Sequence, residues 1–404
     1  MYRNASASVV LCTRSNSVPQ IKSTDLEPPD PQMRDEHRYL IKSLLHASRL
    51  IAAFQSEGEV LRLRDLVERT GMNRMTCFRI LYTLHHCGLL EKLAENQYRP
   101  RFIIRQKRKF VLGYASQGQN DSFPRDVEAS LVRAAEEANF ELIVVSNRHD
   151  AKTAVRNAER LVRERVDLAI VFQAEEVVAP SVAARFLDAK IPLIAIDIPH
   201  PGATYFGADN YRAGLIAGNY LGRWVNKRWN GEADEILMLG IGRAGSLPNA
   251  RLRGTLDSLS EVVRNAAHIR TVNLDGDGTF GRSYECTRAH LRASTAKRIL
   301  VGAANDPSAV GAVRAFEECG RQMNCAVIGH NADPEGRAEM RRPQTRLIGS
   351  VAFFPETYGP AILRVAIDIL SGKQTPPAVF VKHRLITPEN VDQIYSNDKL
   401  LGIA

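Results

Sequence analysis

Apolar residues recur at helical spacing in three stretches near the start of the chain. The first predicted helix spans residues 37–54, where apolar side chains return every three or four positions. Two shorter helices follow and are joined at Gly71, a residue that takes a left-handed turn without a Cβ clash. The apolar face of the second short helix comprises Met72, Cys77, Ile80, Leu81 and Leu84. This pattern predicts a helix-turn-helix.

Two short extended runs come after the helices, between residues 89 and 102. They flank a turn at Glu95–Gln97, as expected for a β-hairpin. Helix, helix-turn-helix and hairpin together predict a winged-helix domain over 38–102, a fold that presents its second helix to the DNA major groove. The side chains left outside the apolar core are the candidate DNA contacts: Arg74, Met75, Thr76, Phe78 and Arg79 on the helix, with Gln97 and Arg99 on the hairpin.

From Phe110 onwards the pattern changes to alternating apolar runs and helix-length amphipathic segments. Strand-like runs are FVLGYAS, FELIVVSN, DLAIVFQ and PLIAIDIP, and after TYFGADN a second series comprises EILMLGIG, IRTVNLD, RILVGAAND and AVIGHN. Helices are expected at about 122–138, 151–164 and 177–189. Strand and helix alternation of this kind produces doubly wound parallel sheets.

Two such series in succession predict an α/β domain of two lobes over 110–390. Lobe 1 is expected at about 110–207 and 354–376, and lobe 2 at about 208–353 and 377–390. The remaining segments are predicted to be a flexible tail (1–37), a basic linker (103–109) and a C-terminal tail (391–404). Ligands of such folds bind where the carboxyl ends of the strands meet, so a cleft between the lobes is expected.

The net charge of +9 is concentrated in the predicted winged helix. Residues 38–109 contain 15 Lys or Arg and 6 Asp or Glu, a net charge of +9, whereas 1–37 have a net charge of −1 and 110–404 of +1. A local positive field of this kind suits the phosphate backbone of DNA.

The six cysteines form no CxxC pair and have no His at metal-ligand spacing, so reduced thiols are expected. The first residues lack the long apolar core of a signal peptide, and no stretch reaches the ~20 apolar residues of a membrane helix. We therefore expect a cytoplasmic protein without a membrane partner.

The first domain resembles the IclR-type winged helix. The segment RDLVERTGMNRMTCFRILYTLHHCGLLEKLAENQYR is similar to that family's helix, TG turn, recognition helix, "GLLE" motif and Tyr-containing wing. The resemblance covers roughly 40–102 and implies DNA binding. The rest of the chain does not resemble the effector domain that normally accompanies this winged helix.

Residues 110 to about 390 instead resemble the periplasmic sugar-binding fold of LacI-type repressors. Three segments are similar to that family: GADNYRAGLIAGNYL, PNARLRGTLDSL, and AANDPSAVGAVRAFEECG with AVIGHNAD. The resemblance implies that Arg251 contacts sugar hydroxyls and that Asn305 or Asp306, Asn331 and Asp197 face the ligand. Asn120 and Asp121, which come after the first strand, are further candidates. Asn305 and Asn331 equally suit the capping of a helix N-terminus.

The chain departs from the LacI-type pattern at several ligand-facing positions. The aromatic pair after the first strand is reduced to Phe123, and the Arg after the fourth-strand acid is Ile198. Asn331 stands where the family has an acid, and Phe353 occupies a position that is commonly polar. A sugar or a sugar acid remains the expected ligand, since the donors of Arg251 suit hydroxyls and carboxylates alike.

An enzymatic function is an alternative that a few motifs raise. GIGRAG at 240–245 spells the GxGxxG fingerprint after a strand, but the next helix is predicted to start only at Pro248. The next acidic strand end, Asp275, comes about 30 residues on instead of the ~20 of a dinucleotide site. Ser246 lacks a GxSxG elbow, and the Asp275–Asp277 pair lacks EF-hand spacing. We expect no catalysis, cofactor or metal.

The favoured hypothesis is a transcription regulator that binds operator DNA and senses a small polar ligand, most simply a sugar. A homodimer or a dimer of dimers is expected, because two half-sites make short recognition helices specific. The alternatives are a transport-type sugar-binding protein without a DNA role and an NAD-binding enzyme. The operator and the direction of the response to ligand stay open.

Overall fold

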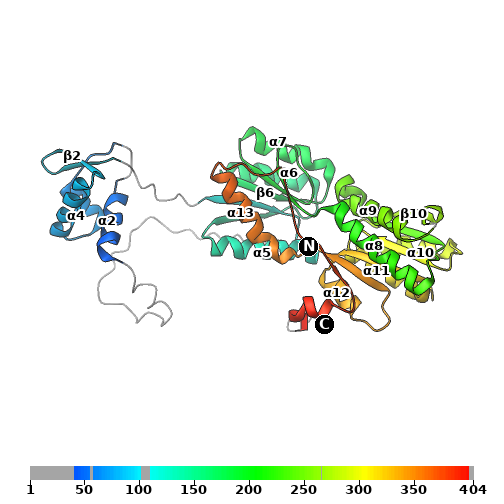
Figure 1. The fold of residues 1–404 in the computed structure, drawn as a ribbon. Coiled ribbons are helices and arrows are strands. Elements are labelled where there is room, and N and C mark those ends of the chain that lie inside the picture. Colours follow the sequence, from blue (N-terminus) through cyan, green and yellow to red (C-terminus); the bar gives the residue numbers. More distant parts are fainter. Residues whose placement is uncertain (1–40, 55–57, 102–109, 265, 400–404) are drawn as a thin grey trace, which may run out of the picture. The chain divides into compact units, whose positions relative to one another are not determined.

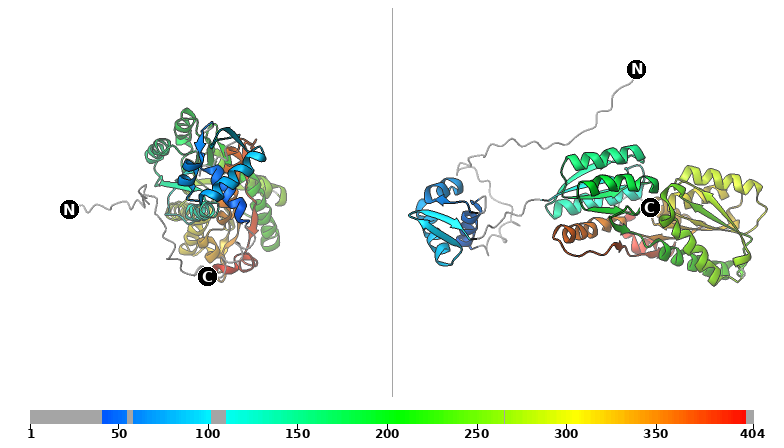
Figure 2. Two further views of the ribbon diagram at one scale, coloured as in Figure 1. Left: turned by 90° about the vertical axis from the view of Figure 1, so that its left-hand side faces the viewer. Right: turned by 90° about the horizontal axis from the view of Figure 1, so that it is seen from above.

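The structure, a computed structural model, describes residues 41–54, 58–101, 110–264 and 266–399 (Figures 1 and 2). The chain forms two compact units that divide between Arg108 and Lys109. The first unit has a three-stranded sheet and the second has two six-stranded sheets. The predicted tail 1–37 and the predicted linker 103–109 lie outside the described residues.

The first unit is a winged helix in its order of elements. These are α2 (Lys42–Ala52), β1 (Leu61–Arg62), α3 (Leu63–Thr70), α4 (Arg74–His86), β2 (Leu90–Ala94) and β3 (Gln97–Pro100). The strands pair antiparallel in the order β1-β3-β2. The hairpin turn comprises Glu95 and Asn96 alone, because the positive φ of Asn96 (61°) closes it in two residues and Gln97 already pairs with Arg62.

The apolar face of α4 packs as its spacing predicted. Cys77, Leu81 and Leu84 are buried together with side chains from the other two helices and the wing. The chain turns from α3 into α4 through Gly71, whose φ is 65°, and Asn73 caps α4 by accepting a hydrogen bond from the Met75 amide at 2.8 Å. This core fixes which side of α4 remains exposed.

The first lobe of the second unit is a parallel sheet covered on both faces by helices (Figure 1). Its strands, in sheet order, are β14 (Ala378–Phe380), β8 (Thr204–Gly207), β7 (Leu193–Ile196), β6 (Leu168–Phe172), β4 (Val111–Ser116) and β5 (Glu141–Ser146). One face is covered by α5 (Ser122–Glu137) and α13 (Tyr358–Leu370), and the other by α6 (Ala151–Arg163) and α7 (Ala179–Asp188). The three helices predicted in this region begin and end within two residues of their expected bounds.

The second lobe repeats the arrangement with one antiparallel edge strand. Its strands, in sheet order, are β10 (Arg270–Asp275), β9 (Glu235–Gly240), β11 (Ile299–Ala303), β12 (Cys325–Asn331), β13 (Leu347–Ala352) and β15 (Arg384–Ile386). One face is covered by α8 (Asn210–Trp229) and α9 (Ser246–Val262), and the other by α10 (Phe280–Ala293) and α11 (Asp306–Glu318). The short helices α12 (Pro334–Met340) and α14 (Val391–Ile394) complete it. This is the two-lobed α/β fold that the strand and helix alternation predicted.

The last crossing between the lobes lies later in the chain than predicted. Residues 378–380 were assigned to lobe 2, but β14 pairs with β8 and extends the sheet of lobe 1. The chain returns to lobe 2 only after Phe380, where β15 pairs with β13. The sequence of a three-residue strand has too few positions to show which sheet the strand joins. The boundary between the lobes therefore follows only from the pairing of β14 with β8.

The predicted C-terminal tail is wrong for residues 391–399, which are folded against lobe 2. Asp398 is buried and accepts hydrogen bonds from Arg337 of α12, at 2.7 Å from Nε and 2.9 Å from Nη2. Arg341 approaches the same carboxylate at 2.9 Å. Two guanidinium groups therefore hold Asp398 and the residues next to it against lobe 2, which the sequence alone does not reveal.

The helices α8 and α9 pack unusually closely. Gly214, Gly218 and Gly222 share one face of α8, and a Cβ on any of them would overlap α9. Gly254 makes the reciprocal approach from α9 to α8. The close packing brings the first residue of α8, Asn210, within hydrogen-bonding distance of Arg251 on α9.

Candidate functional site

A cavity of about 130 Å³ lies between the two lobes, at the carboxyl ends of their strands. This volume is well above the ~10–15 Å³ that a single water needs on the same measure, so the cavity has room for a small molecule. Its lining combines aromatic side chains with carboxylates, amides and two guanidinium groups. A few polar groups in a partly apolar cleft are typical of a small-molecule pocket.

Arg251 reaches the cavity from α9 and is held by protein contacts. Its Nε and Nη2 donate to Asn210 Oδ1 at 2.9 and 2.5 Å, and its Nη1 donates to the Ala304 carbonyl at 2.7 Å. The guanidinium also lies over the Phe353 ring, 4.9 Å from its centroid. The side chain is therefore oriented before any ligand arrives, which reduces the entropy lost on binding.

Asp197 comes directly after β7 and contributes a half-buried carboxylate to the cavity. Burial raises its pKa to about 6, while Arg251 and the backbone N–H of Ala208, which donates to Oδ1 at 3.3 Å, act in the opposite direction. The carboxylate is thus mostly ionised at neutral pH and accepts hydrogen bonds from hydroxyl groups.

The lobe 2 side of the cavity is built on the ends of β11 and β12. Asn305 caps α11 by accepting a hydrogen bond from the Ser308 amide at 3.1 Å, and it also lines the cavity. Asn331 donates from Nδ2 to Asp333 Oδ2 at 3.1 Å. Asp333 is buried, and its Oδ1 has no hydrogen-bond partner among the described residues. Burial, and then the neighbouring Asp306, raise the pKa of Asp333 well above its usual range.

The lobe 1 side contributes aromatic surface and a polar rim. Phe123 meets Phe172 edge to face, with ring centroids 6.3 Å apart. At the rim, His149 Nε2 lies 3.5 Å from Asp121 Oδ2. Ser122 donates to Glu335 of lobe 2 at 2.8 Å, so the lobes contact each other directly beside the cavity.

Six of the nine ligand-facing residues that the sequence proposed line this cavity. They are Asp121, Phe123, Asp197, Arg251, Asn305 and Asn331. Three do not line it. Asn120 lies in the loop after β4, one residue before Asp121, the first residue of this pair that lines the cavity. Asp306 is fully buried in lobe 2, where it accepts hydrogen bonds from Ser350 Oγ at 2.6 Å and from the Asp333 amide at 2.8 Å. Phe353 packs behind Arg251.

The sequence interpretation missed several polar groups that line the cavity: Gln117, Gln173, Arg243, Asp277 and Asp333. Gln117 and Gln173 come directly after β4 and β6, so the strand-end rule could have found them. Arg243 lies inside the GIGRAG motif, which was weighed only as a dinucleotide loop. That loop forms a 3₁₀ turn at Gly242–Ala244, and α9 then begins at Ser246, two residues before the predicted start at Pro248.

In the first unit, the predicted DNA contacts of α4 lie on its solvent side. Arg74 and Arg79 are exposed, and the apolar Met75 and Phe78 are 66% and 42% exposed. Thr76 is half-buried. On the wing, Gln97 is also half-buried, and Arg99 pairs with Glu91 at 2.7 Å. Exposed apolar side chains on a basic helix are typical of a binding surface.

Within the described ranges, no helix is long and apolar enough to cross a membrane, and no group of three or more His, Cys, Asp or Glu side chains could hold a metal ion.

The fold is a two-lobed α/β domain with a cavity between its lobes, in the same chain as a winged helix. Residues 112–374, more than half of the chain, match the periplasmic binding protein domain family, and the chain belongs to it. Residues 43–94 match the IclR helix-turn-helix domain. The suspected combination of an IclR-type helix-turn-helix with a periplasmic-binding-protein-like domain is thereby confirmed. No curated protein matches the chain.

Solved structures similar to the chain come from solute-binding proteins of ABC transporters. One from Bacillus halodurans with bound myo-inositol is 22% identical, with a TM-score of 0.62, and the match covers 71% of this chain and 98% of that protein. One from Actinobacillus succinogenes with bound D-allose is 18% identical, with a TM-score of 0.61 and coverage of 70% and 100%. One from Mycobacterium smegmatis with bound glycerol is 18% identical, with a TM-score of 0.64 and coverage of 70% and 96%. At these identities the similarity establishes the fold.

Proposed function

We propose that this protein is a sugar-responsive transcription regulator. A small hydroxyl-rich ligand, a sugar or a related polyol, binds in the cavity between the lobes, and the winged helix binds operator DNA. The observation that carries the proposal is a cavity between the lobes that several polar side chains line, with Arg251 already oriented in it, on a chain that also has an IclR-type helix-turn-helix.

The chemistry of the cavity supports a polyhydroxylated ligand. Asp197 accepts hydrogen bonds, Arg251 donates them, and the amide of Asn331 does both, so neighbouring hydroxyls that each donate and accept are matched. Phe123 and Phe172 supply apolar surface for the C–H face of a ring. The similar solved structures hold myo-inositol, D-allose and glycerol, which are ligands of this chemical type.

The DNA-binding part of the proposal rests on α4 and on charge. Arg74, Thr76 and Arg79 are proposed to contact bases or nearby phosphates, with Met75 and Phe78 providing apolar contacts. Gln97 and Arg99 of the wing are proposed to contact the backbone. The whole excess charge of the chain, +9, falls within 38–109, as phosphate binding requires. Binding as a homodimer would place two such helices on a two-fold operator.

A thermal-shift screen of the full-length protein against sugars, polyols and sugar acids tests the ligand. A ligand at 100 times its dissociation constant stabilises the folded state by about 2.7 kcal/mol, which is readily measured. Arg251→Ala is expected to abolish the shift, because it removes the oriented donors of the cavity. The exposed Arg253→Ala, two residues along α9 and outside the cavity, is the matched control and should keep it.

No shift with any compound of the panel would contradict the proposed function. An equal shift in wild type and Arg251→Ala would place the ligand elsewhere.

A further inference from the structure

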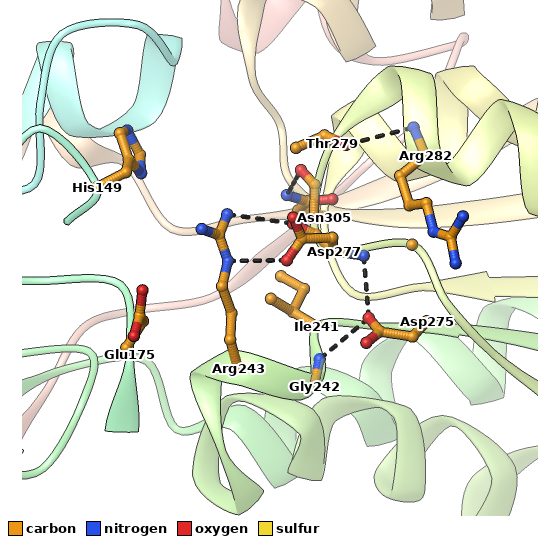
Figure 3. Close-up of polar contacts among 12 residues, drawn as sticks. His149, Glu175, Ile241, Gly242, Arg243, Asp275, Asp277, Thr279, Arg282 and Asn305 are labelled. Carbon is orange, nitrogen blue, oxygen red and sulfur yellow. Dashed lines mark hydrogen bonds and ion pairs between the residues drawn. The ribbon is translucent and has the colours of Figure 1, made fainter. Parts of the chain in front are cut away.

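The loop Gly240–Gly245, between β9 and α9, brings a second guanidinium group into the cavity. Arg243 Nε lies 2.9 Å from Asp277 Oδ1, and its Nη2 donates to the Asp277 carbonyl at 3.3 Å (Figure 3). Neither contact uses Nη1. Figure 3 shows one edge of the guanidinium against Asp277 and the other toward the side where His149 and Glu175 of lobe 1 lie. That second edge can donate to an oxygen of the ligand.

The position of Asp277 is itself fixed from two sides. Asp275, at the end of β10, accepts from the Gly242 amide at 3.2 Å and from the Asp277 amide at 3.0 Å. The Asn305 side chain donates to the carbonyl of Gly278 at 2.8 Å. The Arg243–Asp277 pair is therefore a built feature of lobe 2 that stays in place without a ligand (Figure 3).

Among the described residues, the charges that line the cavity leave no uncompensated cation for an acidic ligand. Three carboxylates line it, from Asp121, Asp197 and Asp277, against the guanidinium groups of Arg243 and Arg251. The buried Asp333 adds no charge, because its pKa is raised well above the usual range. Asp277 compensates Arg243 by direct contact, and the field of Arg251 acts on Asp197. A ligand carboxylate would therefore meet the remaining carboxylate of Asp121, and its desolvation would go uncompensated.

We infer that the Arg243–Asp277 pair makes the cleft select uncharged sugars over the corresponding sugar acids. This inference rests on the proposed function and deepens it. Arg243 binds a ligand hydroxyl through its second edge, and Asp277 removes the net charge that would otherwise attract a carboxylate. In this role Arg243 is a specificity-determining residue, and Asp277 acts through it.

Matched pairs of probes test the inference: glucose with glucuronate, and galactose with galacturonate. Dissociation constants are measured by titration calorimetry on the full-length protein at neutral pH. Wild type is expected to bind the neutral member of a pair at least tenfold more tightly. Asp277→Asn leaves the charge of Arg243 uncompensated, so the ratio of neutral to acidic affinity should fall about tenfold, a change of about 1.4 kcal/mol.

Arg243→Gln should move the same ratio in the opposite direction. It removes the guanidinium group with its second donor edge and leaves the charge of Asp277 uncompensated, so the neutral sugar binds several-fold more weakly and the acid loses more affinity. Asp257→Asn is the matched control, because Asp257 also faces an arginine of lobe 2, Arg253 at 3.8 Å, but lies outside the cavity. It should leave the ratio at its wild-type value.

The outcomes separate this inference from the proposed function. Failure of wild type to bind any member of the panel overturns the proposed function and removes the basis of the inference. Wild-type binding with the acid preferred, or with a ratio that neither Asp277→Asn nor Arg243→Gln changes, overturns the inference alone. Opposite shifts in the two variants support it, and each variant can carry the test if the other fails to fold.

Discussion

At the scale of single residues, the cavity depends on polar groups that the fold has taken out of water. Asp197 illustrates how burial of a charged group lowers the stability of the fold. Its pKa is raised from 3.8 to about 6, mainly by burial, even though Arg251 opposes the change. The folded state thus holds the charged form of this carboxyl less favourably than the unfolded chain does. A carboxylate that lines the cavity is maintained here at the expense of stability.

Asp197→Asn should therefore change how stability depends on pH. Below pH 3.8 the carboxyl is protonated in both the folded and the unfolded state. In this range the folded state does not bear the cost of the charged carboxylate. As the pH rises through about 6, wild type loses on the order of 3 kcal/mol from this group. Relative to wild type, the variant should gain that amount between about pH 4 and pH 7, measured as free energy of unfolding in urea.

The half-buried Asp257, which lies outside the cavity, serves as the control: Asp257→Asn should not show this pH-dependent gain. If the free energy of unfolding of Asp197→Asn also followed that of wild type at every pH, the charged carboxylate of Asp197 would not destabilise the fold.

The residues that line the cavity were predictable where they stand at the ends of strands. Asp197, Asn305 and Asn331 lie at or just beyond the ends of strands β7, β11 and β12, and Arg251 was carried over from a family motif. Arg243 and Asp277 come from two loops about 30 residues apart, and neither is adjacent to a strand end in a way that shows its direction. Their pairing depends on the parallel neighbours β9 and β10 bringing the loops together.

At the scale of elements, the loop Gly240–Gly245 is also a contact between the lobes. Ile241 and Ala244 pack with Ala179 and Ile198 of lobe 1 in a small apolar cluster. Gly245 has φ 85° and ψ −168°, a conformation that is essentially restricted to glycine. A Cβ at this position would overlap the carboxylate of Glu176 in lobe 1.

Gly245→Ala should therefore weaken ligand binding without touching the ligand. The overlap with Glu176 penalises the arrangement in which the lobes meet, and a penalty of about 1.4 kcal/mol or more corresponds to at least a tenfold higher dissociation constant for the sugar. Titration of the variant with the best ligand of the screen measures it.

Gly281→Ala provides the matched control, since a Cβ there meets nothing within 4 Å. Its affinity should equal that of wild type. An unchanged affinity in Gly245→Ala would show that the loop is not part of the ligand-bound contact.

Long periodic elements were predictable and short ones were not. The helices α5 and α6 each span more than three turns, so the spacing of their apolar residues gave bounds close to those observed. Strands β14 and β15 have three residues each, and the C-terminal α14 has four. These elements exist because of their partners, β8, β13 and the Arg337–Asp398 contact, which lie far away in the sequence.

At the scale of the whole molecule, the chain joins two compact units with separate tasks. The first carries the excess positive charge and the exposed face of α4, and the second contains the cavity. A regulator requires that binding at one unit changes the affinity at the other. By thermodynamic linkage, the two effects must be equal in size.

The full-length protein should show this reciprocity with a duplex selected from a random DNA library. The factor by which saturating sugar changes DNA affinity should equal the factor by which saturating DNA changes sugar affinity, measured by fluorescence anisotropy and calorimetry. Arg79→Ala should lower DNA affinity about tenfold, because it removes a base or phosphate contact, and leave sugar affinity in the absence of DNA unchanged. A sugar affinity that is identical with and without DNA would contradict the regulatory role.

The sequence by itself determined the fold class, the two-part organisation and the segregation of charge. Helical and strand periodicities are local properties, and they repeat often enough in 404 residues to be recognised without a structure. The tertiary structure decided where the lobes end, how residues 391–399 pack on lobe 2, and which polar groups meet in the cavity. Each of these depends on contacts between distant segments, as with Arg251 and Asn210 or Arg243 and Asp277. For that reason the GIGRAG loop, which the sequence suggested only as a weak dinucleotide fingerprint, lines the proposed sugar site.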